Sequence, residues 1–451
     1  MIITKKMCAP LRVAGDMDRL PMNDVPAPRR VTIFLKQHYG RPAMPAVEVG
    51  DLVKKGQTIA TSIDYLSANV HASISGEVEA ISSIEDPYGG FSPAVTIKSD
   101  GRDEWHESVK PDPDYRKKSA TELKTILSRA GVTTYDLEPL PLTAAIDPFG
   151  VTKQFISHIG KELYRPIDTV IVNTVDEEPM TVVNQRLFMD RGDEIGDGLW
   201  LLKQITVAGR VVVVVRSVHK RHAENFLGGV YKDNVTEIPD DYPEALPELL
   251  VKRVTGRETP AGETVRAAGA LVVSFEHLLD AVEAVRDGIP NIHEMFTVGG
   301  GAAQPPKNIR VRLGTSLRDV LNFCDFREAQ TAKLVLGGPM RGRAQFSMDM
   351  PVVKGVNTLL ALTAAENPKI EPKHCMNCGA CVDICPVHLQ PNLLTRFCEF
   401  FKYDDAKFQE ELPACIECGL CGFVCPAHRP MLQFIQNAKH HLELDRKGID
   451  L

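Results

Sequence analysis

Long apolar runs and an excess of basic residues are both missing from this sequence of 451 residues. No uninterrupted apolar segment reaches the roughly 18 residues that a membrane-spanning helix needs, and the first residues contain no apolar stretch of the kind found in secretory signals. The formal net charge is −7, so no overall positive field attracts nucleic acid. We therefore expect a cytoplasmic protein that spans no membrane and binds no nucleic acid.

Cysteine is scarce through most of the chain. Of the 11 cysteines, only Cys8 and Cys324 precede residue 375, and the others crowd into the end of the sequence. Disulfide frameworks are typical of short secreted chains, whereas this chain is long enough for about three domains at about 150 residues each. The distribution therefore indicates a multidomain protein with one cysteine-dense module.

That module repeats one motif, C-x2-C-x2-C-x3-C-P, first from Cys375 and again from Cys415. Bacterial ferredoxins use this run to hold two [4Fe–4S] clusters, and the fourth cysteine of each run binds the other cluster. The spacing therefore predicts two [4Fe–4S] clusters and the transfer of single electrons. The expected ligands of cluster I are Cys375, Cys378, Cys381 and Cys425, and those of cluster II are Cys415, Cys418, Cys421 and Cys385.

Cysteine-dense modules also occur as zinc ribbons, as disulfide frameworks and as clusters that serve only as structural staples. Zinc ribbons pair two C-x2-C units, whereas each run here has four cysteines and a trailing proline. A single staple would also serve as well as two. Three cysteines fit no run and are expected to be buried thiols, namely Cys8, Cys324 and Cys398.

Upstream of the cysteines the character of the sequence changes twice. From residue 31 to residue 100, short apolar stretches alternate with turns that contain Gly or Pro, which is typical of β structure. Between 168 and 300, apolar segments alternate with helical patterns, and the five valines at 211–215 indicate a strand covered on both faces. This order predicts a parallel βαβ layer. Residues 308–365 predict a small α+β module, in which Arg341 is expected on a solvated face.

The segments 48–57 and 70–78 resemble the two halves of a lipoyl or biotinyl hairpin domain. Such a carrier domain needs a lysine at the tip between the halves, and residues 62–67 contain none. We therefore expect the barrel-sandwich fold without the carrier function. Gln37 and His38 precede this hairpin, and we expect them to be structural.

Several stretches resemble the C subunit of the Rnf complex, a membrane-bound, ion-translocating ferredoxin:NAD oxidoreductase. They include residues 37–43, the hairpin segments, residues 336–340 and the double cysteine motif, and the resemblance extends over residues 28–435. A more distant resemblance is to the A subunit of the sodium-pumping NADH:quinone reductase, a homologue without the flavin and without the ferredoxin module.

The resemblance implies a multidomain fold of α/β and α+β parts. Its expected divisions are an N-terminal arm and barrel-sandwich hybrid in 1–100, a linker and short helix in 101–140, a Rossmann-like domain of the complex I flavoprotein type in 141–304, a β-grasp (SLBB) domain in 305–365, and a bacterial-ferredoxin-like module with two clusters and a C-terminal helix in 366–451.

The family also implies FMN and NADH sites built on glycine-rich backbone, and here the sequence departs from it. Residues 130–143 keep one glycine of a glycine-rich stretch, and residues 242–248 lack the glycines of a second. A nucleotide phosphate needs backbone N–H groups that no Cβ obstructs, so the sequence argues against bound FMN and NADH. Asn173 and Glu178 still match the family's flavin-site segment and are predicted to be relics of that site.

These observations together predict an electron-transfer subunit, peripheral on the cytoplasmic face of the inner membrane. The expected partners are the other subunits of a Rnf-type complex and a ferredoxin-like, flavoprotein or cytochrome redox partner. The alternative is a soluble, NADH-linked flavin and iron–sulfur reductase that serves another enzyme system, such as cobalamin or proline reduction.

Overall fold

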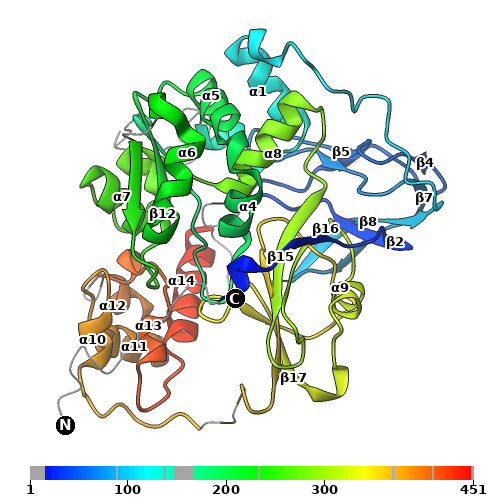
Figure 1. Ribbon diagram of the computed structural model, residues 1–451. Helices are drawn as coiled ribbons and strands as arrows, with labels where there is room; N and C mark the ends of the chain where they lie inside the picture. The colour runs from blue at the N-terminus through cyan, green and yellow to red at the C-terminus, as the bar shows by residue number, and fades with distance from the viewer. Residues whose placement is uncertain are drawn as a thin grey trace.

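The computed structural model describes residues 16–87, 90–135, 139–146, 166–231, 234–367, 369, 371–408 and 411–447. Four parts follow one another along the chain in Figure 1: a β-rich part in blue, an α/β part in green, a sheet in lime and yellow, and a helical part in orange and red. Within the described ranges, no helix is long and apolar enough to cross a bilayer.

The N-terminal part consists of two small antiparallel sheets with the strand orders β2-β8-β7-β4 and β3-β5-β6. Alternate residues along β2 and β8 point inward, so Val31 and Ile33 pack with Val95 and Ile97 in one core. This confirms the predicted barrel-sandwich fold. The strands are β2 (Arg30–Phe34), β3 (Met44–Pro45), β4 (Leu52–Val53), β5 (Thr58–Thr61), β6 (Val70–His71), β7 (Gly76–Glu85) and β8 (Phe91–Ser99).

The central part is a parallel four-stranded sheet with the order β13-β12-β11-β14. One face packs against α7 through Leu250 and Val251, and the other packs against α5 and α8, among others through Leu202 and Leu278. Helices therefore cover both faces of the sheet, which explains the continuous valine run of β12. The strands are β11 (Thr169–Asn173), β12 (Arg210–Arg216), β13 (Val235–Ile238) and β14 (Ala270–Ser274).

The helices of this layer follow the strands as expected for a Rossmann-like domain. The preceding helix, α1, lies against α5 and α8. Its N-cap residue, Ser119, forms a capping box with Glu122. The helices are α1 (Ala120–Arg129), α4 (Val183–Arg191), α5 (Ile195–Ile205), α6 (Lys220–Tyr231), α7 (Pro247–Thr255) and α8 (Phe275–Arg286).

The third part is a mixed sheet with the order β1-β16-β15-β19-β17-β18, crossed by the single helix α9. A first hairpin, β15–β16, places β15 parallel to the last strand, β19, which is the β-grasp arrangement. The elements are β1 (Met22–Asp24), β15 (His293–Gly299), β16 (Lys307–Arg312), α9 (Leu317–Phe323), β17 (Thr331–Leu336), β18 (Arg343–Gln345) and β19 (Thr358–Thr363).

Two segments of this sheet come from outside the range 305–365. Residues 300–306 form the connection of the β15–β16 hairpin, so β15 precedes the expected start of the domain at residue 305. The N-terminal arm supplies β1, which pairs in parallel with β16 at the edge of the sheet. The Gly and Pro residues in 299–306 therefore mark a turn within one sheet.

The linker region is folded and tied to its neighbours. Asp103 pairs with Arg312 and Lys55. After α1 the chain forms the antiparallel hairpin β9 (Thr133–Tyr135) and β10 (Pro139–Pro141), followed by α2 (Leu142–Ile146). The short 3-10 helices are η1 (Asp16–Arg19), η2 (Tyr115–Lys117), η3 (Gly192–Glu194), η4 (Ser217–His219), η6 (Val265–Ala268), η7 (Glu328–Gln330) and η8 (Leu412–Ala414).

The cysteine-rich part is helical and lies against the α/β part and the β-grasp sheet (Figure 1). Its two shortest helices, α10 and α13, adjoin one another, and α11 packs on the long C-terminal helix α14. The helices are α10 (Ala380–Ile384), α11 (Pro391–Glu399), α12 (Tyr403–Phe408), α13 (Leu420–Phe423) and α14 (Met431–Lys447).

Candidate iron–sulfur site

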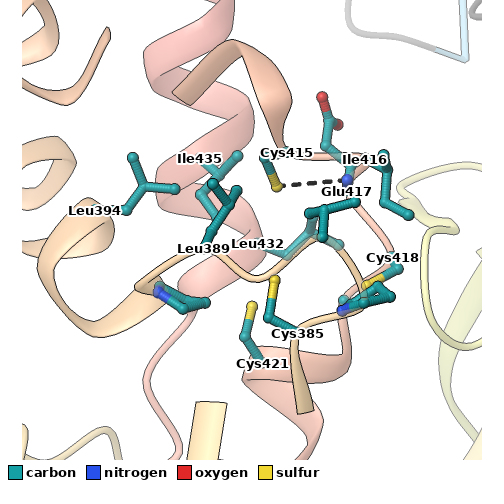
Figure 2. A pocket seen from close by; sticks show the side chains of 14 residues that line it. Cys385, Leu389, Leu394, Cys415, Ile416, Glu417, Cys418, Cys421, Leu432 and Ile435 are labelled. Carbon is teal, nitrogen blue, oxygen red and sulfur yellow. Dashed lines mark hydrogen bonds between the residues drawn. The ribbon is translucent and has the colours of Figure 1, made fainter. Parts of the chain in front are cut away.

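The eight motif cysteines line two pockets in the C-terminal part. Each pocket takes three cysteines from one run and the fourth from the other run. The first is lined by Cys385, Cys415, Cys418 and Cys421, and the second by Cys375, Cys378, Cys381 and Cys425. Figure 2 shows the first pocket, with cysteines entering from separate segments of the chain. The division is the one that the spacing predicts, and the binding of clusters by these cysteines stays a prediction.

The two runs have the same backbone conformation. Gly379 and Gly419 lie in the left-handed region, at φ of 82° and 76°, and each precedes the short helix that carries the third cysteine of its run. Two residues earlier, Asn377 and Glu417 also have positive φ, at 53° and 55°. This conformation costs a non-glycine residue about 1–3 kcal/mol. Its repetition at matching positions indicates a loop shaped to present its cysteines.

Both pockets are open hollows between the two cysteine runs. They enclose about 390 and 350 Å³, including the space at their open mouths. In the part of the chain that the structure describes, no three His, Cys, Asp or Glu side chains come close enough to hold one metal ion. Four cysteines around each pocket suit a [4Fe–4S] cluster, which four thiolates hold.

Burial keeps the thiols of Cys415 and Cys418 protonated in the absence of metal. It raises the pKa of Cys415 to about 11 and the pKa of Cys418 to about 12. Lys439 partly opposes this effect at Cys415, and its Nζ donates to the Cys415 carbonyl at 2.6 Å. Because metal binding requires thiolates, filling this pocket must release protons.

The two pockets face different surroundings. In the first, Cys418 packs with Tyr242 of the α/β part and Met340 of the β-grasp part. In the second, Cys378 is exposed, and the lining side chain of Met376 is 63% exposed. Phe423, two residues before Cys425, is 54% exposed. Cluster II would therefore lie at the junction of three parts of the molecule, and cluster I at the surface.

The two predicted flavin-site relics have structural partners. Asn173, at the end of β11, donates to the Ala245 carbonyl at 3.3 Å and accepts from the Val175 amide at 3.0 Å. Glu178 accepts from the Met340 amide and from Arg341 Nε, both at 2.9 Å. Burial raises the pKa of Glu178 to about 7. Both side chains are therefore engaged within the protein.

The segment that replaces the family's glycine-rich stretch is filled with core side chains. Leu140 and Leu142 are buried in the main core of the α/β part. Gly131, the one glycine left, has φ +65° and packs against the Asn69 carbonyl, which an added Cβ would meet at 2.3 Å. Its own carbonyl accepts a hydrogen bond from Lys354 Nζ. The described residues 130–135 and 139–146 therefore do not fit a flavin phosphate, and residues 136–138 lie outside the described ranges.

Sequence reasoning gave no functional role to two residues near the first pocket. Arg341, expected on a solvated face, is partly buried and pairs with Glu177 and Glu178. Tyr242 lies in a stretch noted only for its missing glycines, yet its hydroxyl donates to the Cys418 carbonyl at 2.6 Å. The only sequence signal for these two residues is that they lie beside or within the family segments 336–340 and 242–248. Gln37 and His38 are buried and hydrogen-bonded to backbone, as expected for structural residues.

The three remaining cysteines fall into two groups. Cys324 and Cys398 are buried in separate apolar cores, and burial raises their pKa to about 12 and about 11. Both are unpaired thiols, as predicted. Cys8 lies outside the described residues.

Three family models match the chain: the RnfC barrel sandwich hybrid domain at residues 15–102, the Nuo51 FMN-binding domain at 153–283 and the 4Fe-4S binding domain at 368–388. With the fold and the cysteine pockets, these matches define a multidomain iron–sulfur protein of electron transport. They confirm the predicted combination of folds. They do not test how many clusters are bound, or whether the flavin-type domain of this chain binds FMN.

The particular family follows from the curated relatives. The chain is 33% identical over 421 residues to the C subunit of the proton-translocating ferredoxin:NAD(+) oxidoreductase complex of Clostridium ljungdahlii, with 93% of this chain and 89% of that protein covered. It is also 33% identical over 377 residues to the C subunit of the ion-translocating oxidoreductase complex of Rhodobacter capsulatus, with coverage of 81% and 69%. The chain belongs to the RnfC family of C subunits. These names support the Rnf interpretation and not the soluble reductase.

Among solved structures, the chain is similar to an NAD+-reducing [NiFe]-hydrogenase in the air-oxidized state. The TM-score is 0.44 at 14% sequence identity, and the match covers 73% of this chain and 55% of that one.

Proposed function

We propose that this protein is the electron-transfer subunit of an Rnf-type ion-translocating oxidoreductase, and that it passes single electrons through two [4Fe–4S] clusters. The observation that carries the proposal is the exchange of fourth cysteines: Cys425 lines the pocket of the first run, and Cys385 lines the pocket of the second. Membership of the RnfC family supports the assignment to such a complex.

The order of the clusters follows from their surroundings. Cluster II would be bound by Cys418, which packs with Tyr242 and Met340. Its electrons would therefore pass to and from cluster I or through the surrounding protein. Exposed Met376 lines the cluster I pocket, and exposed Phe423 lies two residues before its ligand Cys425. Apolar side chains of this kind are enriched at protein interfaces. The redox partner, a ferredoxin-like, flavoprotein or cytochrome protein, therefore docks over cluster I.

We further propose that the chain works without FMN and without an NADH site. The support comes from the described hairpin β9–β10 and from α2, whose side chains fill the core where the family has glycines. Asn173 and Glu178 are engaged by protein groups. Electrons would then reach the clusters from another subunit or from a carrier protein.

As a member of such a complex, the protein would sit peripherally on the cytoplasmic face of the inner membrane, held by the other subunits. Separation of membranes by washing tests this placement. In cells that express the whole complex, the chain should sediment with membranes, and in cells that lack the other subunits it should remain in the supernatant. Sedimentation in both cases would contradict docking through partner subunits.

Purification without oxygen tests the cofactor content. The account expects about eight irons per chain, as in two four-iron clusters, no acid-extractable flavin, and no reduction of the clusters by NADH. About four irons would contradict the two-cluster proposal. One flavin per chain with NADH-dependent reduction would contradict only the proposal that the flavin site is lost.

A further inference from the structure

The Cys418 segment of the first pocket packs against a residue that belongs to a different part of the molecule. Tyr242 comes from the α/β part, and its side chain is packed with Leu246, Cys418 and Leu420. Only 6% of Tyr242 is exposed, and its hydroxyl donates to the Cys418 carbonyl at 2.6 Å.

A second contact fixes the same loop from the β-grasp part. The Met340 carbonyl lies so close to Gly419 that an added Cβ would meet it at 2.9 Å. Glu178 holds the Met340 amide at 2.9 Å, and it also binds the neighbouring Arg341. The segment that carries Cys418 therefore contacts two other parts of the molecule, through the Tyr242 hydroxyl and through the backbone of Met340.

We propose that Tyr242 is a positioning residue for cluster II, which fixes the Cys418 segment through its hydroxyl and excludes water from that side of the cluster with its ring. This inference rests on the proposed two-cluster function. It gives the tyrosine of the former flavin-site segment a role toward the iron–sulfur cluster.

The two parts of the side chain should affect the redox potential of cluster II in opposite directions. Cluster potentials depend on nearby hydrogen bonds and on solvent exposure. Without the hydroxyl, the negative end of the Cys418 carbonyl has no donor, so the more negative, reduced cluster is less favoured and its potential falls. Without the ring, water enters and stabilises the more charged, reduced form, so the potential rises.

The test compares Tyr242→Phe, Tyr242→Ala and a matched control, Tyr403→Phe. Tyr403 lies on α12 of the same module, and its hydroxyl accepts from Asn437 at 3.2 Å, away from the Cys418 segment. Redox titrations of anaerobically purified protein, followed by EPR, give the potential of each cluster. Cys378→Ala in the otherwise unchanged chain assigns the signals, because it should leave only cluster II.

The inference predicts a lower cluster II potential in Tyr242→Phe than in the unmodified chain, a higher one in Tyr242→Ala than in Tyr242→Phe, and unchanged cluster I in both. Cluster II of Tyr242→Ala should also be lost several-fold faster in air. If cluster II in both variants behaves as in Tyr403→Phe, the inference is overturned while the two-cluster function stands. If the unmodified protein holds only one cluster's iron and the Cys418 set is empty, the proposed function fails and the inference fails with it.

Discussion

Glu178 binds the backbone of Met340 and Arg341, which lie 162 and 163 residues further along the chain. Its sequence context matches a flavin-site segment, and the sequence could identify the residue but not its partner. Which group a buried carboxylate binds depends on the tertiary contact that buries it. The cysteines behave differently, because their spacing within 11-residue runs already restricts the geometry around a cluster.

Replacing Glu178 tests this structural role. Glu178→Ala should lower the free energy of unfolding by about 3 kcal/mol, because two amides and a guanidinium lose a buried acceptor. Glu177→Ala is the matched control, since it removes only a partly exposed partner of Arg341 and should cost less than about 1 kcal/mol. Denaturant unfolding without oxygen measures both. Equal losses would show that burial of Glu178 does not matter.

At the scale of elements, the local patterns were informative where a segment interacts mainly with itself. The valines of β12 predict the strand that forms, and the short apolar stretches between 31 and 100 predict the β structure that includes β2. The Gly and Pro residues just before residue 307 lie in a hairpin connection, and such residues mark a hairpin as readily as a domain boundary. No local pattern shows that β1 pairs with β16, which begins only at Lys307.

The segment around β9 offers a test of how closely the elements are packed. Gly131→Ala should cost about 3 kcal/mol, because the new Cβ meets the Asn69 carbonyl at 2.3 Å and backbone cannot easily yield. Gly256→Ala is the control: its φ of +73° is also left-handed, but nothing lies within 4 Å of the new Cβ. It should cost about 1 kcal/mol. Thermal unfolding measures both variants. Equal decreases in melting temperature would contradict the close packing of Gly131.

At the scale of the whole molecule, three parts meet around Lys354. Its Nζ donates to the Gly131 carbonyl at 2.7 Å, and its amide donates to Gln37. His71 from the barrel-sandwich part and His277 from α8 are both buried nearby, since the charge of Lys354 contributes to their lowered pKa values. Burial is the larger cause, and it lowers the pKa of His71 to about 3 and that of His277 to about 4.

Buried neutral histidines make stability depend on pH. Above pH 6.5 His71 is neutral in both states, so its contribution to stability is fully present. As the pH falls from 6.5 towards 3, the unfolded chain takes up a proton that the folded protein does not, and stability is lost by at most about 1.4 kcal/mol per pH unit. His71→Gln should flatten the fall in melting temperature over this range, and exposed His222→Gln should leave it unchanged. Parallel curves for all three proteins would contradict this assignment.

The exposed surface at cluster I can be tested with the complete complex. Met376→Ser with Phe423→Ser should slow electron exchange several-fold with membranes that contain the other subunits, because apolar contacts at the centre of an interface carry much of the binding energy. The clusters themselves should keep their iron content. Phe346→Ser, an exposed position on the β-grasp part, is the control. An unchanged rate in the double variant would place the docking surface elsewhere.

The most direct test of the central claim is the pairing of cysteines with clusters, measured by iron content and EPR of four alanine variants purified without oxygen. The account predicts that Cys425→Ala loses the same EPR signal as Cys375→Ala, that Cys385→Ala loses the same signal as Cys415→Ala, and that each variant retains about four irons, one four-iron cluster's worth. If Cys425→Ala instead loses the signal lost in Cys415→Ala, the two clusters are not held by the exchanged sets, and the proposed arrangement is contradicted.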